Sequence, residues 1–224
     1  MEKTIVYKEK VFEELKRAII SRTYQPGEIL NERKLASEMD VSRTPVREAI
    51  QLLSNEGWVK VIPWKGAVVQ SVTLQDIEES MQLRMAIEPV VIDLVIYKIG
   101  EKEISYLEKL FEEQMTLAQV GDAENFILQD QEFHLFLAEL TGNQRLCQIM
   151  RQLRDIHLRI GVEAMQQSHR FPEIIEEHGN ILECLKTNEI LGARRAMLEH
   201  LLVTHRSMVR HIKSLEQGGG KNEG

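Results

Sequence analysis

The most informative stretch of the chain is PGEILNERKLASEMDVSRTPVREAIQLLSNEGWVKVIPWKGAVV, residues 26–69. It contains two short amphipathic helical patterns separated by a tight polar break, and a compact β-rich hairpin follows them. Two arginines, Arg43 and Arg47, stand at the beginning of the second helical pattern. This order of elements indicates a winged helix-turn-helix, a module that places one helix in the DNA major groove.

Apolar periodicity and capping residues place the helices of this module. A first helix is expected over about residues 5–21, because its apolar side chains recur on one face. Asn31 can cap a second helix, since its side chain can accept from the free N–H groups of a first turn. Ser42 or Thr44 can cap a third helix, and Pro45 suits the first turn, where a missing N–H costs nothing.

The outer face of the third helix is polar near its N-terminus and carries Arg43, Thr44, Arg47 and Gln51. Arginine can bond a guanine edge or clamp a phosphate, and the positive end of the helix dipole also favours phosphate. Arg33 on the preceding helix could reach the DNA backbone beside it. The alternative is a solvated charged face on which Arg47 pairs with a neighbouring glutamate.

A small wing follows the third helix. The β-rich run from Trp58 to Ile62 ends at Pro63, Lys65-Gly66 makes a turn, and residues 67–69 return. The pattern predicts a two-stranded hairpin whose tip presents Lys65 to a phosphate or to the minor groove. Because so small a hairpin is marginal alone, we expect it to pack on the helices.

Three motifs in this region resemble the GntR family of bacterial transcription regulators: VSRTPVREAI, the L-x-x-E-G-W pattern from Leu53 to Trp58, and the turn KGAVV. Where some relatives carry a basic or histidine wing tip, this chain has Trp64-Lys65. The resemblance implies binding to a double-stranded DNA operator, with contacts from Arg33, Ser42, Arg43, Thr44, Arg47, Lys65 and Gly66.

Charge is unevenly distributed along the chain. The net charge is −7, yet residues 1–70 contain 12 Lys and Arg against 10 Asp and Glu, and residues 71–224 contain 16 against 25. A mildly basic head on an acidic body fits DNA binding at one end. No apolar run is long enough for a membrane span, charges interrupt the N-terminus where a signal peptide would be apolar, and two cysteines make no disulfide framework. We therefore expect a cytoplasmic protein without membrane partners.

After Ser71 the pattern is wholly helical. Thr73 can cap a long helix that reaches about Ile99, with a kink at Pro89, and later turn signals divide the remainder into an antiparallel bundle of about six helices. The expected fold class is mainly α. The expected domains are a winged helix-turn-helix over residues 1–71, a helical effector, metal and dimerisation domain over 72–216, and a disordered tail over 217–224.

All seven histidines lie in this helical part. Asp130 and His134 are four residues apart and share a helix face, and His178 and His200 on two later helices could converge with them. One aspartate and three histidines form a ligand set for Zn²⁺, Ni²⁺, Mn²⁺ or Fe²⁺. The ordinary alternative is that these histidines are surface groups or hydrogen-bonded core residues.

The segments DQEFHLFLAELTGN, EEHGNIL and ARRAMLEHL are similar to the metal-bearing form of the FadR-type C-terminal (FCD) ligand-binding domain. This resemblance implies a divalent metal ion, with Zn²⁺ expected in purified protein, held by Asp130, His134, His178 and His200. The remaining histidines match no ligand position and are expected to be structural or solvent-facing: His157, His169, His205 and His211.

Arg84, in the stretch LRMAIEP, also matches a position that is common in this family. It could meet a small carboxylate effector held beside the metal, because arginine pairs with carboxylates through two parallel hydrogen bonds. The alternative is an ion pair with Glu88, one helical turn away.

Two other classes of protein are alternatives to a regulator: a helical metalloenzyme that uses an Asp-His₃ metal site, and a DNA-binding protein without a ligand. A ferritin-like di-iron enzyme would need Glu-x-x-His pairs, and no histidine here has a glutamate three residues before it; zincin, P-loop and nucleophile-elbow motifs are also missing. A DNA-binding protein without a ligand would not need so large a body. We therefore predict a homodimeric, metabolite-responsive transcription regulator, not an enzyme, that binds a pseudo-palindromic operator as a repressor.

Overall fold

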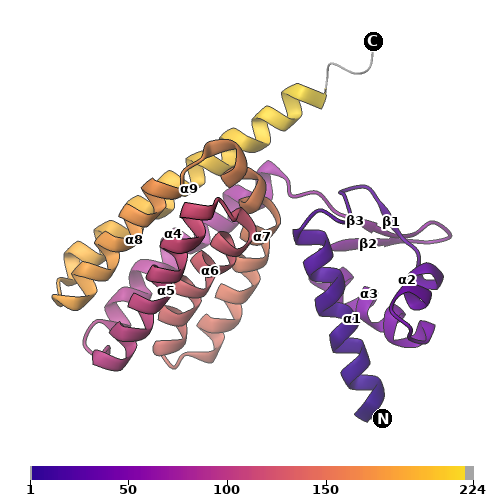
Figure 1. Cartoon of the computed structure of the whole chain (residues 1–224), viewed down its shortest axis with the longest axis horizontal. Coiled ribbons are helices and arrows are strands. Elements are labelled where there is room, and N and C mark those ends of the chain that lie inside the picture. Colours follow the sequence, from indigo (N-terminus) through magenta and orange to yellow (C-terminus); the bar gives the residue numbers. More distant parts are fainter. Residues whose placement is uncertain (1, 220–224) are drawn as a thin grey trace. The chain divides into compact units, whose positions relative to one another are not determined.

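The computed structural model describes the backbone of residues 2–219 (Figure 1). The chain forms two compact units, residues 1–71 and residues 72–224. Each unit has its own hydrophobic core, and each is described by itself below.

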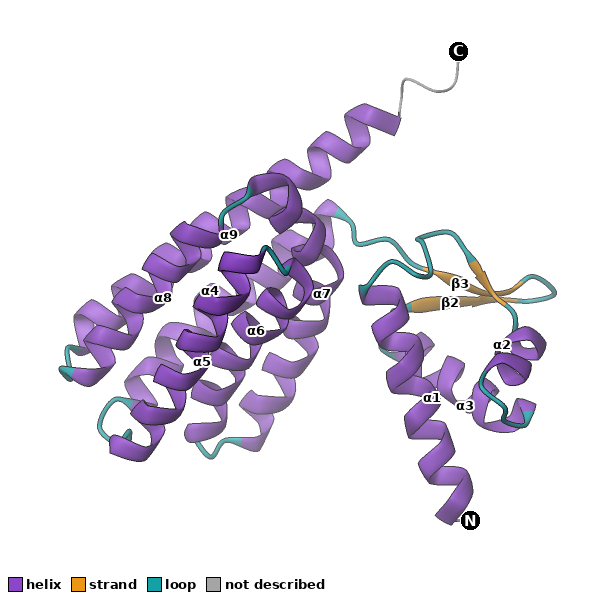
Figure 2. Ribbon diagram, viewed as in Figure 1, coloured by secondary structure: helices purple, strands orange, loops and turns teal. Residues whose placement is uncertain are grey.

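The first unit is a three-helix module with a small antiparallel sheet (Figure 2). Its expected first helix begins three residues earlier than the periodicity suggested and ends one residue earlier. The elements are α1 (Glu2–Ile20), β1 (Ile29–Leu30), α2 (Glu32–Glu38), α3 (Arg43–Asn55), β2 (Val59–Ile62) and β3 (Gly66–Val69).

Apolar stripes on α1 and α3 form the centre of this unit. Leu15, Val46, Leu53 and Trp58 are fully buried there. Asn31 caps α2 as expected, because its Oδ1 accepts hydrogen bonds from the backbone N–H groups of the first turn. Helix α1 packs on α3, and the polar residues at the N-terminal end of α3 remain exposed.

The wing differs from the expected two-stranded hairpin. Strand β3 lies between β2 and β1, so the sheet has three strands in the order β1-β3-β2. Ile29 pairs with Val68, and Val59 pairs with Val69 on the other side. The short strand β1 supplies hydrogen-bond partners to an edge of β3 that would otherwise be exposed, which fixes the hairpin on the module.

The second unit contains six long helices within the described residues, in agreement with the predicted mainly α fold. Thr73 caps the first of them in a reciprocal capping box with Asp76. The helices are α4 (Leu74–Val95), α5 (Glu101–Val120), α6 (Ala123–Leu140), α7 (Gln144–Ser168), α8 (Phe171–Lys186) and α9 (Ile190–Gly219).

Two boundaries in this unit differ from the sequence-based expectation. Helix α4 ends at Val95 rather than near Ile99, because the chain turns through residues 96–98 toward the N-cap at Gly100. Helix α9 continues to Gly219, so the first part of the expected disordered tail is helical. The rest of that expected tail, residues 220–224, lies outside the described residues.

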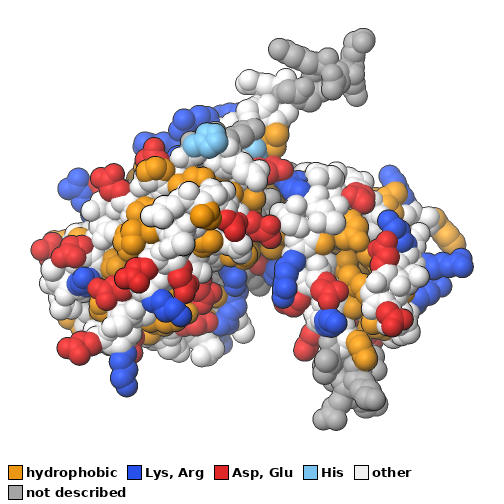
Figure 3. Space-filling model, viewed as in Figure 1, with side chains coloured by type: hydrophobic (Ala, Val, Ile, Leu, Met, Phe, Trp, Pro, Cys, Tyr) orange, Lys and Arg blue, Asp and Glu red, His pale blue; other side chains and the backbone are white. Residues whose placement is uncertain are grey.

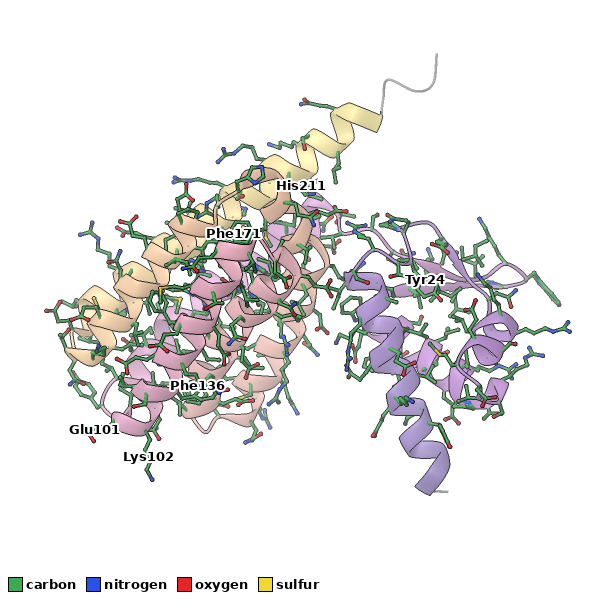
Figure 4. All side chains as sticks on the ribbon, viewed as in Figure 1. Tyr24, Glu101, Lys102, Phe136, Phe171 and His211 are labelled. Carbon is green, nitrogen blue, oxygen red and sulfur yellow. The ribbon has the colours of Figure 1, made fainter. Side chains whose placement is uncertain are left out.

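The core of the helical unit contains side chains from all six of its described helices. Helix α9 packs most extensively on α4 and α8, and α6 packs on both α5 and α7. The side chains drawn in Figure 4 fill the space between these helices, and labelled Phe171 at the start of α8 packs edge-on against Phe126 of α6. Among the described residues, no helix is both long and apolar enough to cross a membrane.

Candidate nucleic-acid interface and metal centre

The open face of α3 carries the expected DNA-binding side chains. Arg43, Thr44 and Arg47 are exposed at its N-terminal end, and Ser42 is the N-cap residue. Helix and wing enclose a concave surface, and Figure 3 shows Lys and Arg side chains at the edge of this unit where Figure 1 places α2 and the hairpin. Among the residues that line the concave surface are Arg33, Arg43, Arg47, Trp64, Lys65 and Gly66.

Glu32 holds both recognition-helix arginines in the DNA-free protein. Its carboxylate accepts from Arg47 Nη2 at 3.1 Å and from Arg43 Nη2 at 3.4 Å. The hydrogen bond from Arg47 lowers the pKa of Glu32 below its ordinary value. The pairing of Arg47 with a glutamate, which is the alternative to a DNA contact, therefore exists in this structure, and it holds both arginines at the start of α3.

The four expected metal ligands come together inside the helical unit. Asp130 and His134 lie on α6, His178 on α8 and His200 on α9, and all four side chains are buried. Their ligand atoms lie within 4.8 Å of one another. Residues distant in sequence thus form one compact donor set.

The contacts inside this donor set suit a cation better than a hydrogen-bond network. His134 Nε2 and His200 Nε2 are 3.2 Å apart, and His178 Nε2 is 3.4 Å from Asp130 Oδ1. His178 Nε2 has no hydrogen-bond partner among the described residues, although it is fully buried. Because an unsatisfied buried polar atom is costly, these atoms fit a divalent ion placed between them.

Each histidine of the set is oriented by a second side chain that contacts its other ring nitrogen. His134 Nδ1 contacts Glu88 Oε2 at 2.5 Å. His178 Nδ1 contacts Gln114 Oε1 at 2.9 Å, and His200 Nδ1 contacts Glu177 Oε2 at 2.7 Å. An acceptor on Nδ1 places the proton there and leaves Nε2 with a free lone pair, which is the arrangement of metal-binding histidines.

Two arginines anchor the two glutamates. Arg84 Nε donates to Glu88 Oε1 and Arg170 Nη2 donates to Glu177 Oε1, so each carboxylate bridges an arginine and a histidine. Arg84 therefore makes the ion pair considered as the alternative to effector binding. Its Nη1 also contacts His157 Nδ1 at 2.8 Å, whereas its buried Nη2 has no partner among the described residues.

Burial sets the protonation of the site. Desolvation lowers the pKa of His200 to about 3 and that of His178 well below its ordinary value. Burial would raise the pKa of Asp130, but the positive charges that His178, His134 and His200 would carry hold it below the ordinary value. A neutral imidazole and an ionised carboxylate are the forms that bind a metal ion, so the pKa shifts of His178, His200 and Asp130 favour metal binding.

A small cavity of about 20 Å³ lies against the donor set. Asp130, His157, Arg170 and Thr204 contribute to its lining, and the buried Thr204 Oγ1 has no partner among the described residues. This volume accepts about one water molecule, and a larger space of about 670 Å³ shares Ala164, Arg170 and Ser207 with its lining. A ligand in this cavity would contact polar side chains of the site, among them Asp130 and Arg170.

Sequence reasoning missed several residues of this centre. His157 is buried and contacts Arg84, in agreement with the structural role that was one of the two expected for it. Glu177 and Glu88 orient His200 and His134, and neither was expected to do so. Glu177 directly precedes the predicted ligand His178 in the sequence, and Glu88 was expected only as an ion-pair partner of Arg84. A search for an acceptor to orient each predicted histidine ligand could have found both. Gln114 lies on α5, where no pattern in the sequence singles it out.

The winged module with its exposed arginines defines a DNA-binding transcription regulator, and two family models identify the group. The model for bacterial regulatory proteins of the gntR family matches residues 7–69, and the model for the FCD domain matches residues 79–202. The chain therefore belongs to the GntR family, in the FadR-type group that carries an FCD domain. It is a regulator and not an enzyme.

Relatives of similar length support this assignment. The uncharacterized HTH-type transcriptional regulator YdhC of Bacillus subtilis is 29% identical over 223 residues, which are 99% of this chain and 98% of that protein. The gluconate operon transcriptional repressor of Bacillus licheniformis is 28% identical, covering 79% of this chain and 74% of that protein. The Nta operon transcriptional regulator of Aminobacter aminovorans is 30% identical, covering 81% and 85%.

Solved structures share the fold. E. coli McbR/YncC superposes with a TM-score of 0.79 at 23% identity, covering 91% of this chain and 97% of that one. A putative GntR regulator from Rhodococcus sp. RHA1 gives a TM-score of 0.78 at 24% identity, covering 90% and 97%. The mainly helical architecture with an N-terminal winged module is thus confirmed.

Proposed function

We propose that this regulator is a homodimeric repressor whose helical unit binds a divalent metal ion and a small carboxylate effector. The observation that carries the metal part is the orientation of the three histidines. Each has its Nδ1 held by Glu88, Gln114 or Glu177, while its Nε2 faces the shared donor set. Zn²⁺, Ni²⁺, Mn²⁺ and Fe²⁺ all accept one carboxylate and three imidazoles, and Zn²⁺ is the ion we expect in purified protein.

Elemental analysis of the purified full-length protein tests the metal site. We expect about one divalent ion per chain and its loss in His178→Ala, because that change removes one donor of four. His169→Asn is the matched control, since His169 is an exposed histidine with a left-handed backbone that asparagine tolerates. Equal metal content in the two variants would rule out the proposed donor set.

A bound ion would supply a positive centre to which a carboxylate oxygen can bind. The buried Arg84 Nη2 without a partner and the cavity beside Asp130 support an anionic effector at this place. One relative is named for a gluconate operon, and gluconate is itself a carboxylate. Gluconate and related sugar acids are therefore the first compounds to assay.

The effector proposal is tested by adding these acids to the metal-loaded protein on its DNA. We expect one acid to raise the thermal unfolding midpoint and to change DNA affinity by about 5- to 150-fold, the usual range of allosteric coupling. Arg84→Lys should weaken that response, because lysine cannot pair with a carboxylate through two parallel bonds. Unchanged DNA affinity with every metal and acid tested would favour a ligand-independent DNA binder.

An exposed apolar stripe on α4 supports the dimer. Leu83, Val90 and Leu94 recur at helical spacing on α4, and Tyr97 lies in the turn that follows; their side chains are 48%, 45%, 40% and 78% exposed. A second copy of the chain is the occupant that we propose, since a regulator with two heads fits a pseudo-palindromic site. Sedimentation should show a dimer for wild type and for Val120→Glu, an exposed apolar control on α5, and a monomer for Leu94→Glu.

The operator-binding part depends on the exposed end of α3. Arg47→Ala should abolish specific binding to a duplex selected by the wild-type protein, because it removes a base- or phosphate-contacting guanidinium. Its metal content and unfolding midpoint should remain those of wild type. Retained specific binding would show that α3 is not the recognition helix.

A further inference from the structure

Trp64 has an exposed side chain and an unusual backbone conformation, and the DNA contacts expected so far account for neither. Its side chain is 106% exposed, whereas the other tryptophan, Trp58, is fully buried in the core of the same unit. Its backbone has φ +66°, in the left-handed region that bulky side chains rarely adopt. A large apolar ring is thus held in solvent by a strained backbone, a combination that is typical of functional sites.

The local structure fixes this ring at the apex of the wing. Pairing of β2 with β3 ends at Ile62 and Gly66, so residues 63–65 form the turn. The N–H of Lys65 donates to the carbonyl of Ile62 at 3.1 Å and closes the turn. Different residues pack the hairpin on the helices: the buried side chains of Val59, Ala67 and Val69. Trp64 therefore contributes nothing to the core of its own hairpin.

The apex belongs to the DNA-facing surface. Trp64 and Lys65 line the same concave surface as Arg43, Arg47 and Gln51 of α3. When a recognition helix lies in the major groove, a wing beside it faces the sugar-phosphate wall and the adjacent minor groove. The cation at the apex is suited to phosphate, and the aromatic ring is suited to the apolar sugars and base edges.

We propose that Trp64 is a specificity-determining residue that inserts its indole against the minor groove beside the site read by α3. Apolar side chains at such places act as wedges that open the groove, and the cost depends on how easily the local base steps deform. Trp64 would thereby favour a flexible pyrimidine–purine step at the flank of each half-site, a position that α3 does not contact. The proposal depends on DNA binding only and is independent of the metal and effector proposals.

Fluorescence tests the contact directly, because Trp58→Phe leaves Trp64 as the only tryptophan. The probe is a duplex selected from a random library by the full-length wild-type protein. We expect Trp64 emission to shift or be quenched on binding this duplex, and acrylamide quenching to decrease. Unchanged emission and quenching at saturating DNA would overturn the proposal, as would a Trp64 already protected from acrylamide in the DNA-free protein.

Affinity measurements separate a DNA role from a folding role. Trp64→Gly suits the left-handed backbone, so the variant should fold at least as stably as wild type, yet it should bind the selected duplex about tenfold or more weakly. Trp64→Phe should retain most of the affinity, and Val120→Ala is the control for loss of an exposed apolar side chain outside the wing. Wild-type affinity in a stable Trp64→Gly variant would refute the assignment.

Flank and salt dependence identify the kind of contact. Replacing the pyrimidine–purine step at the flank by a stiff A-tract should weaken wild type but leave Trp64→Gly unaffected. The salt slope of binding should be the same for wild type and Trp64→Gly, whereas Lys65→Ala should reduce it by about one because a phosphate contact is lost. A changed slope in Trp64→Gly, or an equal response of both proteins to the flank, would contradict a minor-groove wedge.

Discussion

Glu32 pairs with two of the arginines that we expect to contact DNA, and we infer that it tunes recognition through them. It lies on α2, pairs with both Arg43 and Arg47, and is itself part of the concave DNA-facing surface. A carboxylate at this place repels phosphate but holds two flexible guanidinium groups in position. We therefore expect Glu32 to lower general affinity for DNA and to raise discrimination between sequences.

Glu32→Gln should therefore bind unrelated DNA more tightly and discriminate less between selected and unrelated duplexes. We expect the specificity ratio to fall by about tenfold, because pre-orientation of the arginines is lost together with the repulsion. Fluorescence anisotropy at one fixed salt concentration measures both affinities. Glu38→Gln is the matched control, since Glu38 pairs with Lys34 on the same helix; an equal change in both variants would point to net charge alone.

The lowered pKa of the buried His157 predicts how the free energy of unfolding depends on pH. Burial, followed by repulsion from the Arg84 guanidinium, lowers its pKa to about 3 from an ordinary value of 6.5. The unfolded chain therefore takes up a proton that the folded chain does not, and the resulting loss of stability begins as pH falls below about 6.5 and continues toward about 3.

In metal-free protein, His157→Gln should reduce the slope of unfolding free energy against pH. One group contributes at most about 1.4 kcal/mol per pH unit in this range. Urea denaturation at several values between pH 5 and 8 measures the slopes. Identical slopes for variant and wild type would mean that His157 does not remain neutral in the folded state.

At the scale of elements, the wing depends on a close approach between strands. Gly66 begins β3 with φ +107°, and a Cβ placed on it would lie 3.2 Å from Ile29 Cγ2 on β1. A side chain at residue 66 would therefore be strained by the positive φ and would press against Ile29 of β1. The absence of a side chain at residue 66 therefore allows the hairpin to pack closely against β1.

Gly66→Ala should destabilise the first unit by about 1–3 kcal/mol, since it adds both backbone strain and a contact with Ile29. Gly27→Ala is the control, because Gly27 also has a positive φ but a Cβ there meets open space. Denaturation followed by the emission of buried Trp58 reports on this unit. A smaller effect at Gly66 than at Gly27 would contradict the close approach.

At the scale of the whole molecule, the chain has two units with separate cores, and we expect DNA binding in the first and metal binding in the second. Both tryptophans lie in residues 1–71, and the proposed metal donors lie in the second unit. Ligand binding stabilises the unit that holds the ligand, by an amount that depends on concentration and affinity. Metal removal should therefore affect the two units differently.

Chelation of the metal should lower the thermal midpoint followed by far-UV circular dichroism, to which the six long helices contribute most. The transition followed by tryptophan emission should shift much less, because it reports on the winged unit. Restoring Zn²⁺ should restore the first midpoint. Equal shifts in both signals would show that the units unfold as one, and no shift in either would count against a bound metal.

Local interactions explain what could be predicted from the amino-acid sequence. The cap at Asn31, the capping box at Thr73 and the apolar stripes of the helices depend on neighbours a few residues away. The winged module could be placed because its motif and spacing are short-range features. The proposed metal donors were selected by resemblance, since spacing alone left a structural role for the histidines open.

Contacts between segments distant in sequence determined the features that the sequence did not predict. Glu88 is 46 residues from the histidine it orients and Gln114 is 64 residues from its own, so no local pattern links them. Strand β1 and the ion pairs of Glu32 likewise exist only through contacts between separate elements. The residue types and helix positions follow from the sequence, whereas their meeting inside a dry core depends on how the helices pack, because buried polar groups must find their partners there.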